Sequence, residues 1–286
     1  MIEKALASAA DMIFLDLEDA VAPSEKAVAR QEVIRALHLG SWGTKPTMYR
    51  VNDLSTPWFY RDLIDVVEAA GEQLDLVLVP KVDRPEDVYV VATLLTQLEA
   101  ATGLKRKIGL ELQIESAAGV LAAERIAAAS DRVEAIVFGP GDFAASIGMP
   151  MSAIGTFDAA TFAYPGHRLH GVMQHLVLAG RAAGVRVIDG PFADLRDDDG
   201  LRASSQTARA LGFDGKWCIH PGQIDTVNAA FSPSEAEVAS ARRVVDAHRG
   251  SVMEGRGALL VDGKMVDAAS VRMAQMTLQR SPRPET

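Results

Sequence analysis

Short apolar, β-branched runs recur along this chain, and each ends at a charged or turn residue. They occupy residues 12–20, 47–53, 74–82, 108–116, 134–142, 185–190 and 216–222. The stretches between them have helical composition; Val120, Leu121 and Ile126, for example, are spaced to form one apolar stripe of a helix. Strands that alternate with helices over short connections predict right-handed βαβ units and a parallel sheet.

The number of runs predicts an α/β fold of the TIM (β/α)8 type with its first strand missing. Residues 1–11 resemble the helix that should follow a first strand, yet no strand-like run precedes them. We therefore expect a gap in the barrel beside residues 12–20, or a strand supplied from elsewhere. The chain has 286 residues with 48% hydrophobic content, which is enough for one large core. We assign residues 1–231 to this catalytic barrel domain.

A different pattern follows the last apolar run. Residues 232–235 read Ser-Pro-Ser-Glu, which predicts a capping box at the start of a helix. Asp262-Gly263 between two short apolar runs indicates a hairpin turn, and Asp267 is placed to cap a final helix. We predict that residues 232–286 form a C-terminal helix-hairpin-helix extension.

Composition narrows the class of protein. The net charge of −9 and the absence of a Lys/Arg block argue against nucleic acid as a partner. No run of 18 or more apolar residues occurs, so we expect no membrane span. The single cysteine, Cys218, cannot form an intrachain disulfide, which fits a reducing compartment. Together these features predict a cytoplasmic protein.

Two acidic residues at the ends of consecutive runs are the first candidates for chemistry. Active sites of parallel α/β sheets gather at the carboxyl ends of the strands, where Glu115 and Asp142 would lie. Two neighbouring carboxylates there repel each other unless a cation lies between them. Hard oxygen ligands without a nearby His or Cys favour Mg²⁺, with Mn²⁺ as the alternative, over Zn²⁺. Helix capping or ion pairing by these two acids is the structural alternative.

Cationic and acidic residues end the neighbouring runs. Arg50 has a fixed charge and a planar fork that suit a substrate carboxylate or a developing enolate, and it could also pair with Glu18 or Asp19. Lys81 could contact substrate or form a structural ion pair. We expect Glu18 and Asp19 to organise water or Arg50 within the substrate site rather than to bind the metal.

Several segments in the same order resemble the citrate lyase beta-subunit-like family of the HpcH/HpaI aldolase superfamily. This family includes malyl-CoA, methylmalyl-CoA and citramalyl-CoA lyases, and the resemblance covers nearly the whole chain. The segments are LDLEDAVAPSEKAVAR (15–30), YRVNDLSTPWFYRDL (49–63), LVPKVDRPEDV (78–88), LQIESAAGV (112–120), FGPGDFAASIG (138–148), WCIHPGQI (217–224) and GKMVDAASVRMA (263–274).

The resemblance implies a Mg²⁺-dependent TIM barrel that makes or breaks a carbon–carbon bond between an acyl-CoA and a 2-oxo acid. It implies that Glu115 and Asp142 are the metal ligands and that Arg50 binds substrate and stabilises the enolate. Asp267 would be the acid of a lid that covers the site of a neighbouring subunit, in a homotrimer or a hexamer. One departure is that the family's opening strand, of the form R-S-x-L-x-V-P-G, has no counterpart here.

Two other activities remain open at this point. A pyruvate-type aldolase that acts without CoA is related, but it typically uses an early histidine base and lacks the C-terminal lid. A citrate lyase beta subunit would act on an acyl-carrier-protein thioester and would depend on partner subunits. The residues also leave open the direction of the reaction, the two substrates, and hydrolysis of the thioester after condensation.

Overall fold

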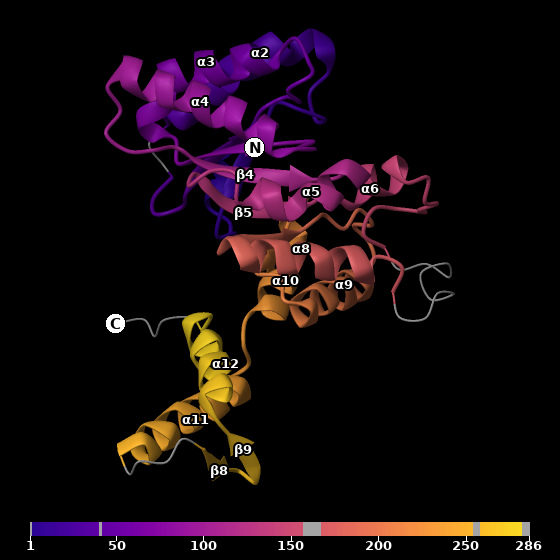
Figure 1. Cartoon of the computed structure of the whole chain (residues 1–286). Helices are drawn as coiled ribbons and strands as arrows, with labels where there is room; N and C mark the ends of the chain where they lie inside the picture. Colours follow the sequence, from indigo (N-terminus) through magenta and orange to yellow (C-terminus); the bar gives the residue numbers. More distant parts are fainter. Residues whose placement is uncertain (1, 40–41, 157–166, 254–257, 282–286) are drawn as a thin grey trace. The chain divides into compact units, whose positions relative to one another are not determined.

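The computed structural model describes residues 2–39, 42–156, 167–253 and 258–281. The chain forms two compact units, Met1–Val227 and Asn228–Thr286, which are described separately (Figure 1). Within the described residues, no helix is long and apolar enough to cross a membrane.

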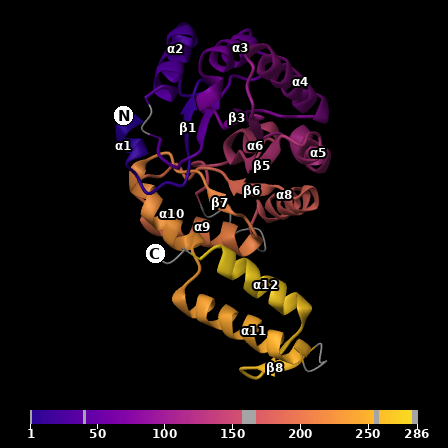
Figure 2. The ribbon, with the colours of Figure 1, turned by 90° about the vertical axis from the view of Figure 1, so that its left-hand side faces the viewer.

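The first unit contains a seven-stranded parallel sheet whose strands are neighbours in chain order (Figure 2). The strands are β1 (Ile13–Asp16), β2 (Thr47–Arg50), β3 (Leu76–Val79), β4 (Gly109–Ile114), β5 (Val133–Phe138), β6 (Arg186–Asp189) and β7 (Gly215–Lys216). The curled sheet is a half-barrel, which confirms the predicted TIM-type fold. In the part of the chain that the structure describes, β1 and β7 are the two edges, so the predicted gap lies beside residues 12–20.

The last strand is shorter than predicted. The run at 216–222 contributes only Lys216 to β7, so Cys218 lies outside the sheet. The Trp217 amide still donates to Asp189, but the Ile219 amide donates to the side chain of Gln223 at 2.9 Å. The chain therefore turns away from β6, and Pro221 has no N–H with which to resume a ladder.

Helices connect the strands and cover the outer face of the sheet (Figure 2). They are α1 (Ile2–Leu6), α2 (Lys26–Leu37), α3 (Phe59–Ala70), α4 (Pro85–Thr102), α5 (Ala117–Ala127), α6 (Pro140–Ser146), α8 (His170–Ala183), α9 (Asp198–Leu211) and α10 (Ile224–Phe231). In α3, for example, Phe59, Leu63 and Val66 are buried on one side, as helical spacing predicts.

The predicted stripe of α5 is partly wrong. Leu121 is 85% exposed, whereas Ala122, Ala123 and Ile126 are buried. The Ser116 side chain caps the helix by accepting from the Gly119 amide at 2.9 Å, which fixes where the helix begins. At helical spacing Ile126 then shares a face with the small alanines, and Leu121 lies off that face.

Side chains of alternate strand residues fill the inside of the half-barrel. Met48, Leu76, Leu78 and Val137 form its apolar cluster, and Ile188 packs against them. Glu111 is paired in register with Leu78, so it faces the same interior. Burial raises the pKa of the Glu111 carboxyl to about 7, although a hydrogen bond from the Trp217 side chain partly offsets this. The interior therefore holds a carboxyl group that favours its neutral form.

The second unit is the predicted helix-hairpin-helix. It contains α11 (Glu235–Met253), the antiparallel strands β8 (Leu259–Val261) and β9 (Lys264–Val266), and α12 (Ala268–Gln279). Asp262 and Gly263 have φ values of 50° and 75°, which fit the type I′ hairpin turn that Asp-Gly favours.

The capping box of α11 lies two residues later than predicted. Ser234 caps the helix, since its Oγ accepts from the Glu237 amide and Glu237 accepts from the Ser234 amide at 2.7 Å. The Ser232 amide instead donates to Asn228 and completes the preceding helix. The sequence contains two overlapping Ser-x-x-Glu patterns. The first cannot cap α11, because the Ser232 amide already completes the end of α10.

The pKa of Glu111 predicts an unusual pH dependence of stability. A folded-state pKa of about 7, against an ordinary value of 4.5, means that the folded protein holds more protons between these pH values. The free energy of unfolding contributed by this group therefore falls as the pH rises through this window. Glu111→Gln keeps an acceptor for Trp217 and cannot ionise, so it should stabilise the protein at pH 8 by up to about 3 kcal/mol.

Urea unfolding at pH 5 and pH 8 measures this effect. Glu99→Gln is the matched control, because burial alone would raise the pKa of Glu99, but its bonds to Arg132 and the Ile108 amide lower it. That variant should lose stability at pH 8. Equal or lower stability of Glu111→Gln at pH 8 would contradict the prediction.

Candidate active site

Polar side chains from several strands meet at the carboxyl edge of the half-barrel. Glu18 follows β1, Arg50 ends β2, and Glu115 follows β4. All three side chains are buried, and Glu115 is only 2% exposed. Buried charges are costly unless they are paired, so the contacts among these groups define the site.

The Arg50 guanidinium is held from three sides. Its Nε and one terminal nitrogen donate to the two oxygens of Asp16 at 2.7 and 2.6 Å. Its other terminal nitrogen donates to Gln113 at 3.3 Å and forms an ion pair with Glu18 at 2.8 Å. The Phe14 and Trp217 rings each lie 5.9 Å from the guanidinium carbon. The fork is therefore fixed in place by hydrogen bonds and aromatic contacts.

Asp16 is a partner that the sequence interpretation did not identify. It is directly opposite Arg50 in the register of β1 and β2, whereas the expected partners were Glu18 and Asp19. Of those two, Glu18 pairs with Arg50, and the only ion pair recorded for Asp19 in the described part of the chain is with Lys81. Burial alone would raise the pKa of Asp16, but its bonds to Arg50 lower that pKa. The signal available in the sequence was that the acids Asp16 and Glu18 alternate with other residues at the end of one strand-like run.

Lys81 links the acids of β1 to Glu115. Its ammonium lies 2.6 Å from Glu18 and 3.6 Å from Asp19. Its backbone N–H donates to Glu115 at 2.9 Å, from a residue with a φ of 52°. That left-handed conformation is uncommon for a residue with a side chain. Burial alone would lower the pKa of Lys81, but the pairing with Glu18 and Asp19 raises it, so the ammonium stays charged.

Glu115 and Asp142 interact electrostatically, as expected for the predicted pair. Burial raises the pKa of Glu115 to about 8, and the charges of Asp142 and Glu18 add to the effect. Asp142 lies in the first turn of α6, and it is exposed. Glu115 accepts hydrogen bonds from the Lys81 amide and from Gln113, and among the described residues it forms no ion pair.

These donors fit a hard divalent cation. Among the described residues, no group of three or more His, Cys, Asp or Glu side chains is arranged to hold a metal. Mg²⁺ does not require one, because it usually binds one or two carboxylates and keeps water or substrate oxygens as its other ligands. Glu115 and Asp142 would supply those two carboxylates. A cation bound there would favour the charged form of Glu115, whose pKa is raised first by burial and then by the charges of Asp142 and Glu18.

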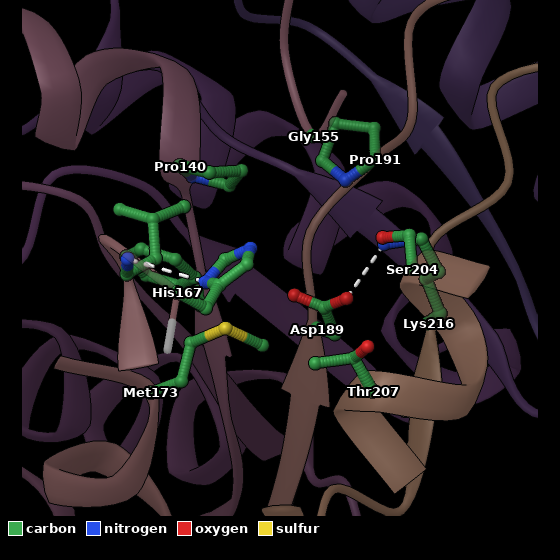
Figure 3. A pocket seen from close by; sticks show the side chains of 11 residues that line it. Pro140, Gly155, His167, Met173, Asp189, Pro191, Ser204, Thr207 and Lys216 are labelled. Atoms are coloured by element: carbon green, nitrogen blue, oxygen red, sulfur yellow. Dashed lines mark hydrogen bonds and ion pairs between the residues drawn. The ribbon is translucent and has the colours of Figure 1, made fainter. Parts of the chain in front are cut away.

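The acid that ends β6 belongs to a different environment. Ile188 packs on the interior cluster, so the next residue, Asp189, points to the outer face. There it pairs with Lys216 at 2.6 Å beside a small cavity lined by His167, Ser204 and other residues (Figure 3). Asp189 and Lys216 are a buried ion pair behind the sheet, separate from the group around Arg50.

Asp267 caps α12 in the second unit. Its carboxylate accepts from the Ser270 amide at 2.9 Å and from the Ser270 hydroxyl at 3.0 Å. The backbone hydrogen bond lowers the pKa of Asp267, so its charged form prevails at neutral pH. The capping role expected from the sequence is present, and a role in catalysis remains a prediction.

Comparisons with known proteins agree with this architecture. The profile of the HpcH/HpaI aldolase/citrate lyase family matches residues 1–221. The L-malyl-CoA/beta-methylmalyl-CoA lyase of Rhodobacter capsulatus is 43% identical over 292 residues, which cover 98% of this chain and 90% of the relative. The (3S)-malyl-CoA thioesterase of Cereibacter sphaeroides is 36% identical over 280 residues, with the same coverage of 98% and 90%.

A solved structure shows the same likeness. The crystal structure of the protein CitE from Mycobacterium tuberculosis, in complex with magnesium, acetoacetate and coenzyme A, aligns with a TM-score of 0.76 at 30% identity. The alignment covers 98% of this chain and 92% of that chain.

A parallel half-barrel with an acid pair and a buried arginine at its carboxyl edge defines an enzyme of the aldolase and lyase class. The chain belongs to the HpcH/HpaI aldolase/citrate lyase family, which confirms the resemblance. It is a carbon–carbon lyase by that membership.

Proposed function

We propose that this enzyme cleaves or forms a 3-hydroxy-3-carboxyacyl-CoA with Mg²⁺ as its cofactor. Malyl-CoA is the substrate that the relatives favour, with citramalyl-CoA as a related candidate; the products would be an acyl-CoA and a 2-oxo acid. The observation that carries the proposal is the convergence of Arg50, Glu115 and Asp142 at one edge of the half-barrel. This convergence supports a fixed cation beside a proposed site for a divalent metal.

The cleavage reaction makes two demands on this site. The 3-hydroxyl group loses its proton, the C2–C3 bond breaks, and its electron pair passes to the thioester as an enolate, which then takes a proton at C2. Bound Mg²⁺ would lower the pKa of the hydroxyl group as a Lewis acid. Glu115 and Asp142 hold that cofactor, and the fixed charge of Arg50 stabilises the enolate oxygen.

Arg50 keeps donors for this task. Three of its five N–H groups donate to Asp16 and Gln113 in the described contacts, and one terminal nitrogen also lies 2.8 Å from Glu18, so no more than two N–H groups are left for a substrate oxygen. Lys81, Glu18 and Asp19 complete the substrate site. Lys81 can approach a substrate carboxylate, since its side chain is one-third exposed, while Glu18 and Asp19 hold it in position.

Asp267 is the proposed proton carrier at C2. Its carboxylate is charged at neutral pH and can therefore accept a proton from the acyl-CoA in the condensation direction. In cleavage the same carboxyl group must return that proton. We propose that it does so from the lid of a neighbouring subunit in a homotrimer or hexamer.

Three rival activities are distinguished by their products, substrates and partners. The thioesterase relative favours hydrolysis of the CoA thioester as the second candidate, which would release a free hydroxy acid and CoA. Chromatography of the products of malyl-CoA distinguishes this from glyoxylate and acetyl-CoA. Activity of the purified chain on free CoA esters would exclude dependence on an acyl-carrier protein, and activity on a CoA-free hydroxy-oxo acid would favour the pyruvate-type aldolase.

The first prediction is metal dependence. Glu115→Gln and Asp142→Asn should each abolish cleavage of malyl-CoA, because each removes one of the two proposed carboxylate ligands. EDTA should abolish the activity of the unsubstituted enzyme, and Mg²⁺ should restore it. Glu111→Gln, a matched change on the same strand, should remain active. Full turnover in excess EDTA would exclude the assignment.

A second prediction concerns the fork of Arg50. Arg50→Lys keeps the charge but loses the bidentate contact with Asp16, so turnover should fall by more than about tenfold. Arg132→Lys is the matched control, since Arg132 also binds a carboxylate with two nitrogens, that of Glu99, each at 2.6 Å. It should lose stability but retain the rate. A near-normal rate for Arg50→Lys would make Arg50 purely structural.

The third prediction tests whether Asp267 acts in trans. Subunits with Asp267→Asn and subunits with Glu115→Gln should each be inactive alone. Coexpression should restore a fraction of the activity, because an intact barrel can then meet an intact lid from another subunit. Verified mixed oligomers that stay inactive would show that the lid does not act in trans.

A further inference from the structure

Gln113 connects the two halves of the proposed site. Its side chain is buried in β4, two residues before Glu115. The amide oxygen accepts from Arg50 at 3.3 Å, and the amide nitrogen donates to Glu115 at 2.5 Å. One uncharged side chain therefore contacts both the cation proposed to stabilise the enolate and a carboxylate proposed to bind Mg²⁺.

The amide makes both contacts without adding charge, because its oxygen accepts and its nitrogen donates. A glutamate here would accept from Arg50 but repel Glu115, and a lysine would attract Glu115 but repel Arg50. The two partners also fix which end of the amide is oxygen, because Arg50 has only donors and an ionised Glu115 has only acceptors. The contact between Arg50 on β2 and Gln113 on β4 passes over the intervening strand β3.

The backbone around this contact leaves room for it. A Cβ atom built on Gly139 would lie 2.4 Å from the Glu115 Cβ, 2.5 Å from its carboxylate and 3.2 Å from the Gln113 amide nitrogen. The glycine after β5 is therefore required by the Glu115 and Gln113 side chains as they are placed. This close approach is a second observation, independent of the hydrogen bonds, that the pair is held in one arrangement.

We infer that Gln113 is a positioning residue that sets the orientation of Glu115 toward the metal and of Arg50 toward the enolate. The inference rests on the proposed function. Partners that orient metal ligands typically change metal affinity or activity by about 10–100-fold when they are removed. Gln113 differs from an ordinary partner of this kind because it should affect the metal and the substrate cation together.

Gln113→Met tests the inference, since methionine has a similar length and no amide. Titration calorimetry of MgCl₂ into the substrate-free protein should show a dissociation constant raised by about tenfold or more. In the malyl-CoA assay kcat should fall, because Arg50 loses its support. Gln223→Met is the matched control, since the Gln223 amide is equally buried but bridges the backbone of Phe192 and Ile219. It should retain Mg²⁺ affinity.

A steric variant keeps the test decisive if Gln113→Met does not fold. Gly139→Ala removes no hydrogen-bonding group, but its added methyl group would press on the Glu115 and Gln113 side chains. It should therefore weaken Mg²⁺ binding as well. Gly171→Ala is its control, because a Cβ atom there would meet nothing within 4 Å. Unchanged Mg²⁺ affinity in folded Gln113→Met or Gly139→Ala protein would overturn the inference.

The two proposals fail in different ways. If the unsubstituted enzyme does not turn over malyl-CoA, the proposed function is wrong, yet the calorimetry needs no substrate and still reports on Gln113. If the Gln113→Met protein retains both turnover and Mg²⁺ affinity, the lyase assignment is supported and the positioning role of Gln113 is excluded.

Discussion

A buried guanidinium, that of Arg50, determines how the strand ends of this half-barrel are arranged. A charge in that position must be neutralised and hydrogen-bonded, and Asp16 and Glu18 of the neighbouring strand do both. Phe14 and Trp217 lie on one side of it, since their ring centroids are 4.8 Å apart and each lies 5.9 Å from the guanidinium carbon. Those rings belong to the two edges of the sheet, where no strand pairing exists in the described residues. Side-chain contacts around one cation thus bridge the gap that the backbone leaves open.

The remaining charges follow from that pairing. Arg50 and Lys81 both form ion pairs with Glu18, which follows β1. No cation of the described chain forms an ion pair with Glu115. Burial raises the pKa of Glu115, and the nearby negative charge of Asp142 raises it further. The fold therefore concentrates uncompensated negative charge at one point while it places a fixed positive charge beside it. This separation suits the proposed roles of holding a divalent cation and stabilising an enolate at one edge of the sheet.

Much of the fold could be predicted from sequence because its signals are local. Apolar runs located the strands, and Asp262-Gly263 located the hairpin through the φ values that only such residues adopt readily. The site residues Arg50 and Glu115 followed from their place at strand ends. The pairing of Arg50 with Glu18 was anticipated, but its bidentate partner Asp16 was not, because that pairing depends on the register of β1 against β2. The end of β7 was also hidden, since the Gln223 side chain that captures the Ile219 amide lies on the following turn.

The strand β4 carries a signal that sequence could have supplied. Buried parallel strands are usually almost continuously apolar, and barrel interiors are usually filled by bulky branched side chains. Glu111, Gln113 and Glu115 break that rule at every second position, while Leu110, Leu112 and Ile114 keep it. Period two places the polar set on one face, which is the interior. They differ in their surroundings: Glu111 and Glu115 are carboxyl groups whose pKa burial raises, to about 7 and about 8, and the uncharged Gln113 amide lies between them. Polarity at alternate positions of a buried strand thus marks the column along which the site is built.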